Sequence, residues 1–180
     1  MTDNNAMKSK KGMALKIIVP ILILSVLVGI WIIKNNKKDT EIAGTGNADF
    51  ELHVTEKIDL EKLKSYGLPI VIDFGADSCI PCKEMAPVLK ELNAELKGKA
   101  IIKFVDVWKY QELAQGYPIS LIPTQIFIDA SGNPLKPKNP QASQMKMYSL
   151  KDKGEHVFTA HEGGMIKDQL LDALKEMGMK

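Results

Sequence analysis

The chain has 180 residues, of which 45% are hydrophobic and 26% are charged, so it has room for one globular domain and a short additional segment. All 24 basic residues are lysine; seven of them fall in residues 1–38 beside one acid, which leaves 17 lysines and 21 acids in residues 39–180. The globular part is thus mildly acidic, without a basic stripe or any arginine, which argues against binding nucleic acid or recognising phosphate.

Residues 17–33 form the first predicted element, an apolar run without a charged side chain. As a helix that rises about 1.5 Å per residue, this run covers most of a bilayer core of about 30 Å, and its flanking residues extend it. We therefore expect a cytoplasmic N-terminus at 1–14, a transmembrane anchor at 15–33, a linker at 34–49 and a globular domain at 50–180.

The residues on either side of the apolar run indicate how it is oriented in the membrane and whether it is cleaved as a signal peptide. Four lysines precede it and three follow it, so the positive-inside rule favours, by one charge, an extracytoplasmic domain on a single-pass protein of the cell membrane. A cleaved secretory signal is the alternative, because Lys8, Lys10 and Lys11 make a positive start. The run is longer than the usual core of a signal peptide and no A-x-A site follows it, which favours an uncleaved anchor. A buried helix of the domain would show a polar face, which this run lacks.

Beyond the linker, the hydrophobic pattern alternates between the helical period and the strand period. Helices are predicted at 59–66, 81–97, 109–115 and 165–177, and strands at 68–74, 100–107, 124–129 and 156–161. This order predicts an α/β fold with a central mixed β-sheet flanked by helices, parallel in its first part and closed by a hairpin.

An insertion of about 20 residues, 135–155, separates the last two predicted strands. Pro137 and Pro140 predict a loop at its start, and residues 145–148 alternate like an edge strand. Loops of this length inside a compact domain usually have a use, so a partner-docking element is one hypothesis. A decorated hairpin without function is the other.

The two cysteines, Cys79 and Cys82, form a single C-x-x-C motif between a predicted buried strand and the start of a helix. A disulfide-stapled small domain or a four-sulfur zinc site needs more cysteines. A helix N-terminus carries unpaired N–H groups and a partial positive charge, which stabilise a thiolate there. We therefore expect Cys79 to be the nucleophile and Cys82, one turn further, to be the resolving cysteine that attacks a mixed disulfide.

Three segments together make the chain resemble the thioredoxin family. Residues 71–87 follow its pattern V-D-F-x-A-x-x-C-x-P-C-K-x-x-A-P, residues 117–124 its Y-x-I-x-x-I-P-T, and residues 163–170 its glycine bend before the last helix. The resemblance covers roughly residues 50–177. It implies a thioredoxin fold and a protein-disulfide oxidoreductase whose reversible Cys79–Cys82 disulfide is its redox group, with no added cofactor and no metal.

The same resemblance implies roles for residues outside the motif. Asp73 matches a buried acid that moves a proton to and from the second cysteine, and burial is expected to raise its pKa toward neutrality. Pro123 matches a cis-proline that faces the cysteines and leaves the backbone of Ile122 free to bind an extended substrate. An aspartate that finds water and an ordinary trans-proline are the alternatives. Lys103 is expected either to approach Asp73 from the next strand or to be solvated.

Several positions depart from the family pattern or leave it undecided. The family commonly has tryptophan where Gly75 and Ser78 stand and glycine where Ile80 stands, so the partner surface is not that of a general thioredoxin. Asp77 disfavours a thiolate at the first cysteine and Lys83 favours it, so the sign of its pKa shift stays open. The remaining histidines, His53, His156 and His161, are scattered and are expected to lie on the surface or to be satisfied by hydrogen bonds.

The expected function is thiol-disulfide exchange with protein thiols and disulfides at the outer face of a membrane. The resemblance implies a reductase, since anchored relatives often take electrons from a membrane thiol transporter of the cytochrome c biogenesis type. A disulfide oxidase or isomerase is the main alternative. A non-catalytic binding module that presents residues 135–155 and a copper or zinc chaperone are the others.

Overall fold

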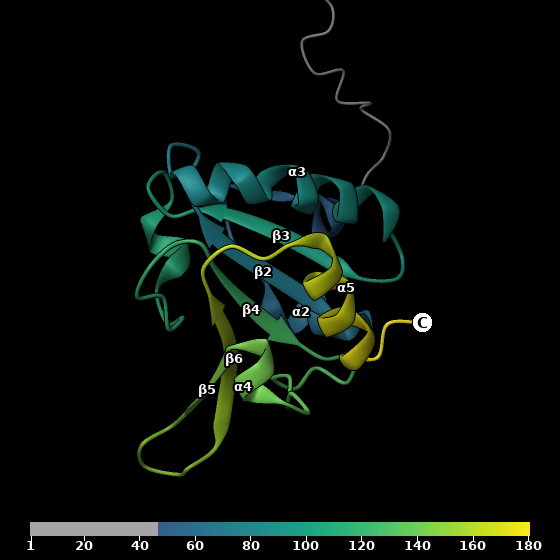
Figure 1. The fold of residues 1–180 in the computed structure, drawn as a ribbon, viewed down its shortest axis with the longest axis vertical. Helices are drawn as coiled ribbons and strands as arrows, with labels where there is room; N and C mark the ends of the chain where they lie inside the picture. Colours follow the sequence, from purple (N-terminus) through teal and green to yellow (C-terminus); the bar gives the residue numbers. More distant parts are fainter. Residues whose placement is uncertain (1–46) are drawn as a thin grey trace, which may run out of the picture. The chain divides into compact units, whose positions relative to one another are not determined.

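Six strands form one mixed sheet in residues 47–180, the part of the chain that the computed structural model describes (Figure 1). Their order across the sheet is β1-β3-β2-β4-β6-β5, where β1 and β3 run parallel to β2, and β4, β6 and β5 are antiparallel to their neighbours. The strands are β1 (His53–Val54), β2 (Ile70–Gly75), β3 (Ile101–Asp106), β4 (Thr124–Ile128), β5 (Met145–Ser149) and β6 (His156–Glu162). The predicted mixed α/β sheet is confirmed.

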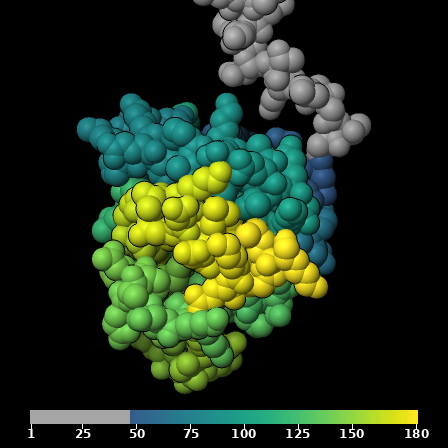
Figure 2. Space-filling view, turned by 45° about the vertical axis from the view of Figure 1, so that its right-hand side comes forward, coloured from purple at the N-terminus to yellow at the C-terminus, as the bar shows by residue number. Residues whose placement is uncertain are grey.

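Helices cover both faces of this sheet, and each face has its own apolar core. They are α2 (Leu60–Ser65), α3 (Ile80–Glu95), α4 (Pro140–Ser143) and α5 (Lys167–Glu176), with short 3-10 turns η1 (Ala48–Phe50) and η2 (Gln111–Ala114). Side chains of α3 and α5 pack together on one face, where Figure 2 shows the two helices side by side, and α2 packs on the other.

Strand β2 shows how the sequence assigns residues to the two faces. Its side chains alternate, so Val71 joins the core under α3 and α5, whereas Ile70 and Ile72 join the core under α2. Asp73 follows the same alternation and therefore points to the face of Val71. A carboxyl group thus enters the sheet face beneath α3, where an apolar side chain would be the default.

Local signals in the sequence account for the start and end of α2. The side chain of Asp59 accepts a hydrogen bond from the N–H of Lys62 (3.2 Å), as a helix cap does. Gly67 follows the helix at φ +63°, a conformation that glycine adopts without steric cost. The helix predicted at 59–66, with its cap and its terminating glycine, is confirmed.

The insertion at 135–155 becomes part of the sheet. Its helix α4 leads into β5, which pairs with β6 at the edge of the sheet, so the edge strand predicted at 145–148 is confirmed. Leu135 and Met145 are buried in the core under α3 and α5. A docking role for this segment stays a prediction.

The predicted N-terminal segments, including the anchor at 15–33 and most of the linker at 34–49, lie outside the described residues. Among residues 47–180, no helix has the length and apolar character that crossing a membrane requires.

Candidate active site

The cysteine motif lies where the loop after β2 enters α3. Cys79 is the N-cap residue of α3 and has extended backbone angles, and its Sγ accepts a hydrogen bond from the N–H of Cys82 (3.4 Å). Pro81 stands in the first turn, where a missing N–H leaves no hydrogen bond unmade. The helix start therefore directs N–H groups and the positive end of its dipole at the first sulfur.

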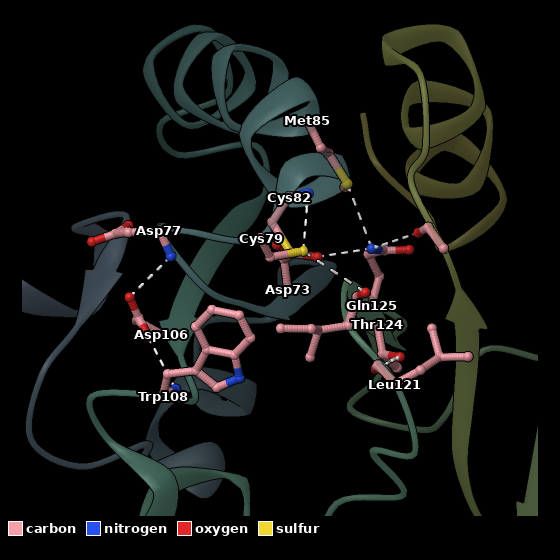
Figure 3. The surroundings of a disulfide bond; sticks show 12 residues. Asp73, Asp77, Cys79, Cys82, Met85, Asp106, Trp108, Leu121, Thr124 and Gln125 are labelled. Atoms are coloured by element: carbon pink, nitrogen blue, oxygen red, sulfur yellow. Dashed lines mark hydrogen bonds between the residues drawn. A yellow bond between two sulfur atoms is a disulfide. The ribbon is translucent and has the colours of Figure 1, made fainter.

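Cys79 and Cys82 are joined by a disulfide, with Cα atoms 5.2 Å apart (Figure 3). The exposed fraction is 9% for Cys79 and 3% for Cys82. The first cysteine is thus the more accessible of the two, and the second faces the protein interior. An incoming thiol or disulfide meets Cys79 first.

The Ile122–Pro123 segment faces the disulfide from the loop before β4. The peptide bond between these residues is cis, the isomer that the resemblance implies. The carbonyl oxygen of Ile122 lies 3.9 Å from the Sγ of Cys79, and the carbonyl oxygen of Pro123 accepts a hydrogen bond from the N–H of Gly163 (2.8 Å). Backbone polar groups thus border the sulfur that a substrate would reach.

Asp73 is fully buried on β2 beneath the motif. Its Oδ1 accepts a hydrogen bond from the Nε2 of Gln125 (2.8 Å), while its Oδ2 has no hydrogen-bond partner within residues 47–180. Burial raises the pKa of Asp73 to about 7, against a smaller lowering by the Gln125 hydrogen bond. A carboxyl with this pKa exchanges a proton readily at physiological pH.

Gly75 allows Asp73 and Cys82 to approach the same small space. A Cβ on Gly75 would lie 3.4 Å from the Oδ2 of Asp73, 3.3 Å from the Sγ of Cys82 and 2.9 Å from the ring of Phe104. A residue with a side chain would therefore occupy the space between the carboxyl oxygen, the second sulfur and the aromatic ring. The departure from the family tryptophan at this position has a local steric reason here.

We predict that Gly75→Ala lowers the free energy of unfolding by about 1–3 kcal/mol, because the added methyl overpacks this space. Thermal or denaturant unfolding measures the change. Phe104→Leu is the matched variant, since it removes the ring atom nearest to the new methyl. The double variant should therefore lose less stability than the sum of the two single changes. Strictly additive losses would contradict the steric explanation.

Lys103 meets neither of its two expectations. It is buried, and its Nζ donates hydrogen bonds to the carbonyl oxygens of Ala48 (2.9 Å) and Glu51 (2.6 Å). The parallel register places Lys103 beside Ile72, and Phe104 beside Asp73. The lysine therefore faces away from the carboxyl and holds the start of the domain, and an aromatic residue takes the position next to Asp73.

Three exposed apolar side chains surround the motif: Ile80, Trp108 and Leu121, with exposed fractions of 73%, 63% and 46%. We call these three residues the apolar rim. Figure 3 shows Trp108 and Leu121 on the side of the disulfide away from Met85. Ile80 follows Cys79 directly in the chain. Exposed apolar side chains grouped beside a reactive group are typical of a protein-binding surface.

The carboxylate of Asp106 fixes the loops that carry Cys79 and Trp108. It accepts hydrogen bonds from the backbone N–H groups of Asp77 (3.1 Å), Trp108 (3.0 Å) and Lys109 (3.1 Å). These bonds and the nearby Lys109 ammonium lower the pKa of Asp106, against the effect of its burial. Asp77 itself forms an ion pair with Lys109. The positive charge of Lys109 therefore partly offsets the electrostatic effect of the Asp77 carboxylate on Cys79.

The structure thus gathers the five predicted site residues, Cys79, Cys82, Asp73, Ile122 and Pro123, around one disulfide. Sequence reasoning did not single out Trp108, Phe104 or Gln125. Only Gln125 left a signal, as a long polar side chain in the fully buried strand β4. The histidines are expected either to lie on the surface or to be satisfied by hydrogen bonds. For His161 the second alternative holds, since its Nδ1 lies 3.0 Å from the Oε1 of Gln125.

Comparisons with known proteins agree with this arrangement. The family model described as Thioredoxin matches residues 51–152, more than half of the chain. A thioredoxin from Mycoplasmoides gallisepticum is 39% identical over 75 residues, which are 42% of this chain and 74% of that protein. Thioredoxin C-2 from Corynebacterium nephridii is 47% identical over 55 residues, 31% of this chain and 51% of that protein.

The solved structure of a point mutant of thioredoxin from Halobacterium salinarum NRC-1 shares the fold, with a TM-score of 0.50 at 23% identity. The likeness covers 76% of this chain and 98% of that one. Thioredoxins exchange dithiol for disulfide through a cysteine pair and use no cofactor, and the described residues 47–180 contain such a pair. The chain therefore belongs to the thioredoxin family and is a protein-disulfide oxidoreductase of that type.

Proposed function

We propose that the protein is a membrane-anchored reductase of protein disulfides, with Cys79 as nucleophile, Cys82 as resolving cysteine and Asp73 as proton acceptor. The observation that carries this proposal is the shared space at Gly75. There the Oδ2 of Asp73, which has no hydrogen-bond partner among the described residues, and the Sγ of Cys82 both lie within 3.4 Å of the position that a Cβ on Gly75 would take, beneath the more exposed Cys79. A base placed at the second sulfur is what resolution of a mixed disulfide requires.

In the reaction the reduced protein gives two electrons to a substrate disulfide. The Cys79 thiolate attacks one substrate sulfur, forms a mixed disulfide and releases the other substrate sulfur as a thiolate that takes a proton from solvent. Asp73 then accepts the proton of the Cys82 thiol. The Cys82 thiolate attacks the Sγ of Cys79, releases the second substrate thiolate and leaves the Cys79–Cys82 disulfide. An external dithiol reduces this disulfide and completes the cycle.

The substrate lies, in this proposal, along Ile122 and Pro123 and against the apolar rim. The Ile122 carbonyl oxygen beside Cys79 supplies a backbone acceptor for an extended segment, as in strand addition. The rim supplies apolar contact on the same side of the disulfide. Protein substrates with an apolar side chain near their cysteine therefore fit this site best.

Membrane attachment and the electron donor complete the proposal and rest on the sequence. The uncharged run at 17–33 and the extra lysine before it support a single-pass protein of the cell membrane with an extracytoplasmic domain. Outside the cytoplasm, the oxidised pair needs a donor that brings electrons across the bilayer. We infer a membrane thiol transporter of the cytochrome c biogenesis type as that donor.

The direction of electron flow is tested by the midpoint potential of the Cys79–Cys82 couple, measured against glutathione or dithiothreitol buffers. A value near about −270 mV, as in thioredoxin, supports a reductase. A value near about −120 mV is that of a strong oxidant and would overturn the reducing role while leaving thiol-disulfide exchange in place.

We predict that Trp108→Ala lowers kcat/KM for a protein disulfide by about tenfold, since removing an aromatic anchor from an interface typically costs more than about 1 kcal/mol. The rate with a small disulfide, which does not reach the rim, should stay unchanged. Met147→Ala is the matched control, because Met147 is also an exposed apolar residue but lies on the edge strand β5. Equal losses for both variants, or for both substrates, would contradict a role of Trp108 in recognition.

A further inference from the structure

A buried chain of hydrogen bonds connects Asp73 with a histidine at the far side of β4. Gln125 donates from Nε2 to the Oδ1 of Asp73 (2.8 Å) and to the carbonyl oxygen of Gly163 (3.1 Å). The Oε1 of Gln125 lies 3.0 Å from the Nδ1 of His161. Figure 3 shows Gln125 between the Asp73 carboxyl and the strand that carries His161. The three side chains come from β2, β4 and β6, neighbouring strands of the sheet.

The partners of Gln125 determine where the protons of this chain lie. Its amide nitrogen faces two acceptors, a carboxyl oxygen and a carbonyl oxygen, so the nitrogen must be the donor in both bonds. The amide oxygen then requires a donor, and His161 must carry its proton on Nδ1. One orientation of Gln125 satisfies all three bonds, whereas a flipped amide would lose the bonds to the ionised Asp73 carboxylate and to the Gly163 carbonyl oxygen.

Few other titratable or charged groups face this chain. The Oδ2 of Asp73 shares the space at Gly75 with the Sγ of Cys82, and Phe104 of β3 lies beside Asp73. Gln125 contacts the sulfur of Met85 from α3 (3.5 Å), while Lys103 points to the other face of the sheet. His161 lies opposite Met145 of β5 in the ladder.

Neighbouring charges do little to His161. Glu162 follows it in the chain, and its carboxylate is paired with Lys146 (2.6 Å). Burial lowers the pKa of His161, so the ring is neutral at neutral pH. Because His161 is neutral, it acts on the Asp73 carboxyl through the hydrogen bonds of Gln125 and not through a charge.

We propose that Gln125 and His161 are positioning residues that hold Oδ1 of Asp73 and so leave Oδ2 as the oxygen that exchanges a proton with Cys82. This inference rests on the proposed role of Asp73. His161 fixes the amide of Gln125, and Gln125 fixes the carboxyl. The bond from Gln125 also stabilises the ionised carboxyl more than the neutral one, because hydrogen bonds to charged groups are stronger. The pair therefore sets the pH at which Asp73 begins to accept the proton of Cys82.

The test is a carbon NMR titration of the Asp73 carboxyl in the disulfide form, where neither cysteine titrates. Gln125→Leu removes the hydrogen bond and should raise the titration midpoint by about one pH unit. His161→Phe removes the donor that orients Gln125 and should raise the midpoint by about half a unit. His161→Asn keeps an N–H donor near the position of Nδ1 and should leave the midpoint unchanged.

A kinetic readout accompanies the titration. The pH profile of single-turnover reduction of a protein disulfide by the reduced protein should move to higher pH in Gln125→Leu and His161→Phe, with a largely unchanged plateau at alkaline pH. A residue that only supports the fold would lower the rate at every pH alike. Unchanged midpoints and profiles in both variants would overturn the inference, and so would equal shifts in His161→Phe and His161→Asn.

Asp73→Asn separates this inference from the proposed function beneath it. If Asp73 is not the proton acceptor, this variant keeps the wild-type pH profile, and the proposed function fails. If Asp73→Asn loses the profile while Gln125→Leu and His161→Phe keep it, only the positioning role fails. Should Gln125→Leu not fold, the two His161 variants still test the positioning role. They differ only at position 161, where asparagine keeps an N–H donor for Gln125 and phenylalanine does not.

Discussion

Replacing Cys79 with serine is expected to abolish the reduction of insulin by dithiothreitol that the wild-type protein catalyses. A hydroxyl at this position is not ionised at neutral pH, so the helix start no longer presents a thiolate to the substrate disulfide. Removal of an essential nucleophile lowers turnover by at least about a thousandfold. The rate of insulin precipitation at a fixed dithiothreitol concentration measures the loss.

The control for Cys79→Ser is Ser78→Ala, which alters the neighbouring exposed residue of the same loop and should leave the rate near that of wild type. Cys82→Ala gives an independent check, because Cys79 can still attack but no second thiol resolves the product. This variant should accumulate a mixed disulfide with its substrate, visible as a mass increase that dithiothreitol reverses. Wild-type turnover by Cys79→Ser would remove the basis of the proposed mechanism.

Asp73→Asn is expected to stabilise the disulfide form at pH 8 by up to about 4 kcal/mol while it slows resolution by about a hundredfold. The pKa of Asp73 is about 7 in the folded protein, against about 3.9 in an unfolded chain. Between these values the folded state holds a proton that the unfolded state has lost. Wild-type stability therefore falls as the pH rises from about 4 to about 7. Asparagine stays neutral throughout and avoids this fall.

The measurement is the midpoint of thermal or denaturant unfolding at several pH values. Wild type and Asp73→Asn should have nearly equal stability at about pH 4 and diverge as the pH rises to about 8. Asp77→Asn is the matched control, because Asp77 is an exposed aspartate in the same region, and its difference from wild type should be small. A constant difference between wild type and Asp73→Asn at all pH values would show that Asp73 titrates normally.

The sequence was sufficient to predict the fold and to name residues that lie together around the disulfide, for identifiable reasons. The order of helical and strand periods predicts a mixed sheet, and the position of the cysteine pair at a strand-to-helix junction predicts that Cys79 lies at the start of a helix. The family pattern links Asp73 and Pro123 to that pair although both lie elsewhere in the chain. Strand β1 escaped prediction because its two residues carry no period.

Lys103 marks the limit of such reasoning. Neighbouring residues of a strand point to opposite faces, so an error of one residue in register reverses every assignment. The pattern places a lysine on the strand next to Asp73, but only the pairing of Asp73 with Phe104 shows that the lysine points away. The contacts of Gln125 with His161, 36 positions apart in sequence, likewise depend on strand pairing and not on any local motif.

Asp106 holds the loops beside the disulfide through hydrogen bonds from their main chain. The hydrogen bonds it accepts from positions 77, 108 and 109 all come from main-chain N–H groups. The path of both loops is therefore largely independent of which side chain stands at Trp108. Under the proposed role of Trp108 in substrate recognition, selectivity for protein substrates can be re-engineered by varying the side chain at this position alone, while the backbone that presents Cys79 keeps its place. Variation at Asp106 itself would disturb both loops at once.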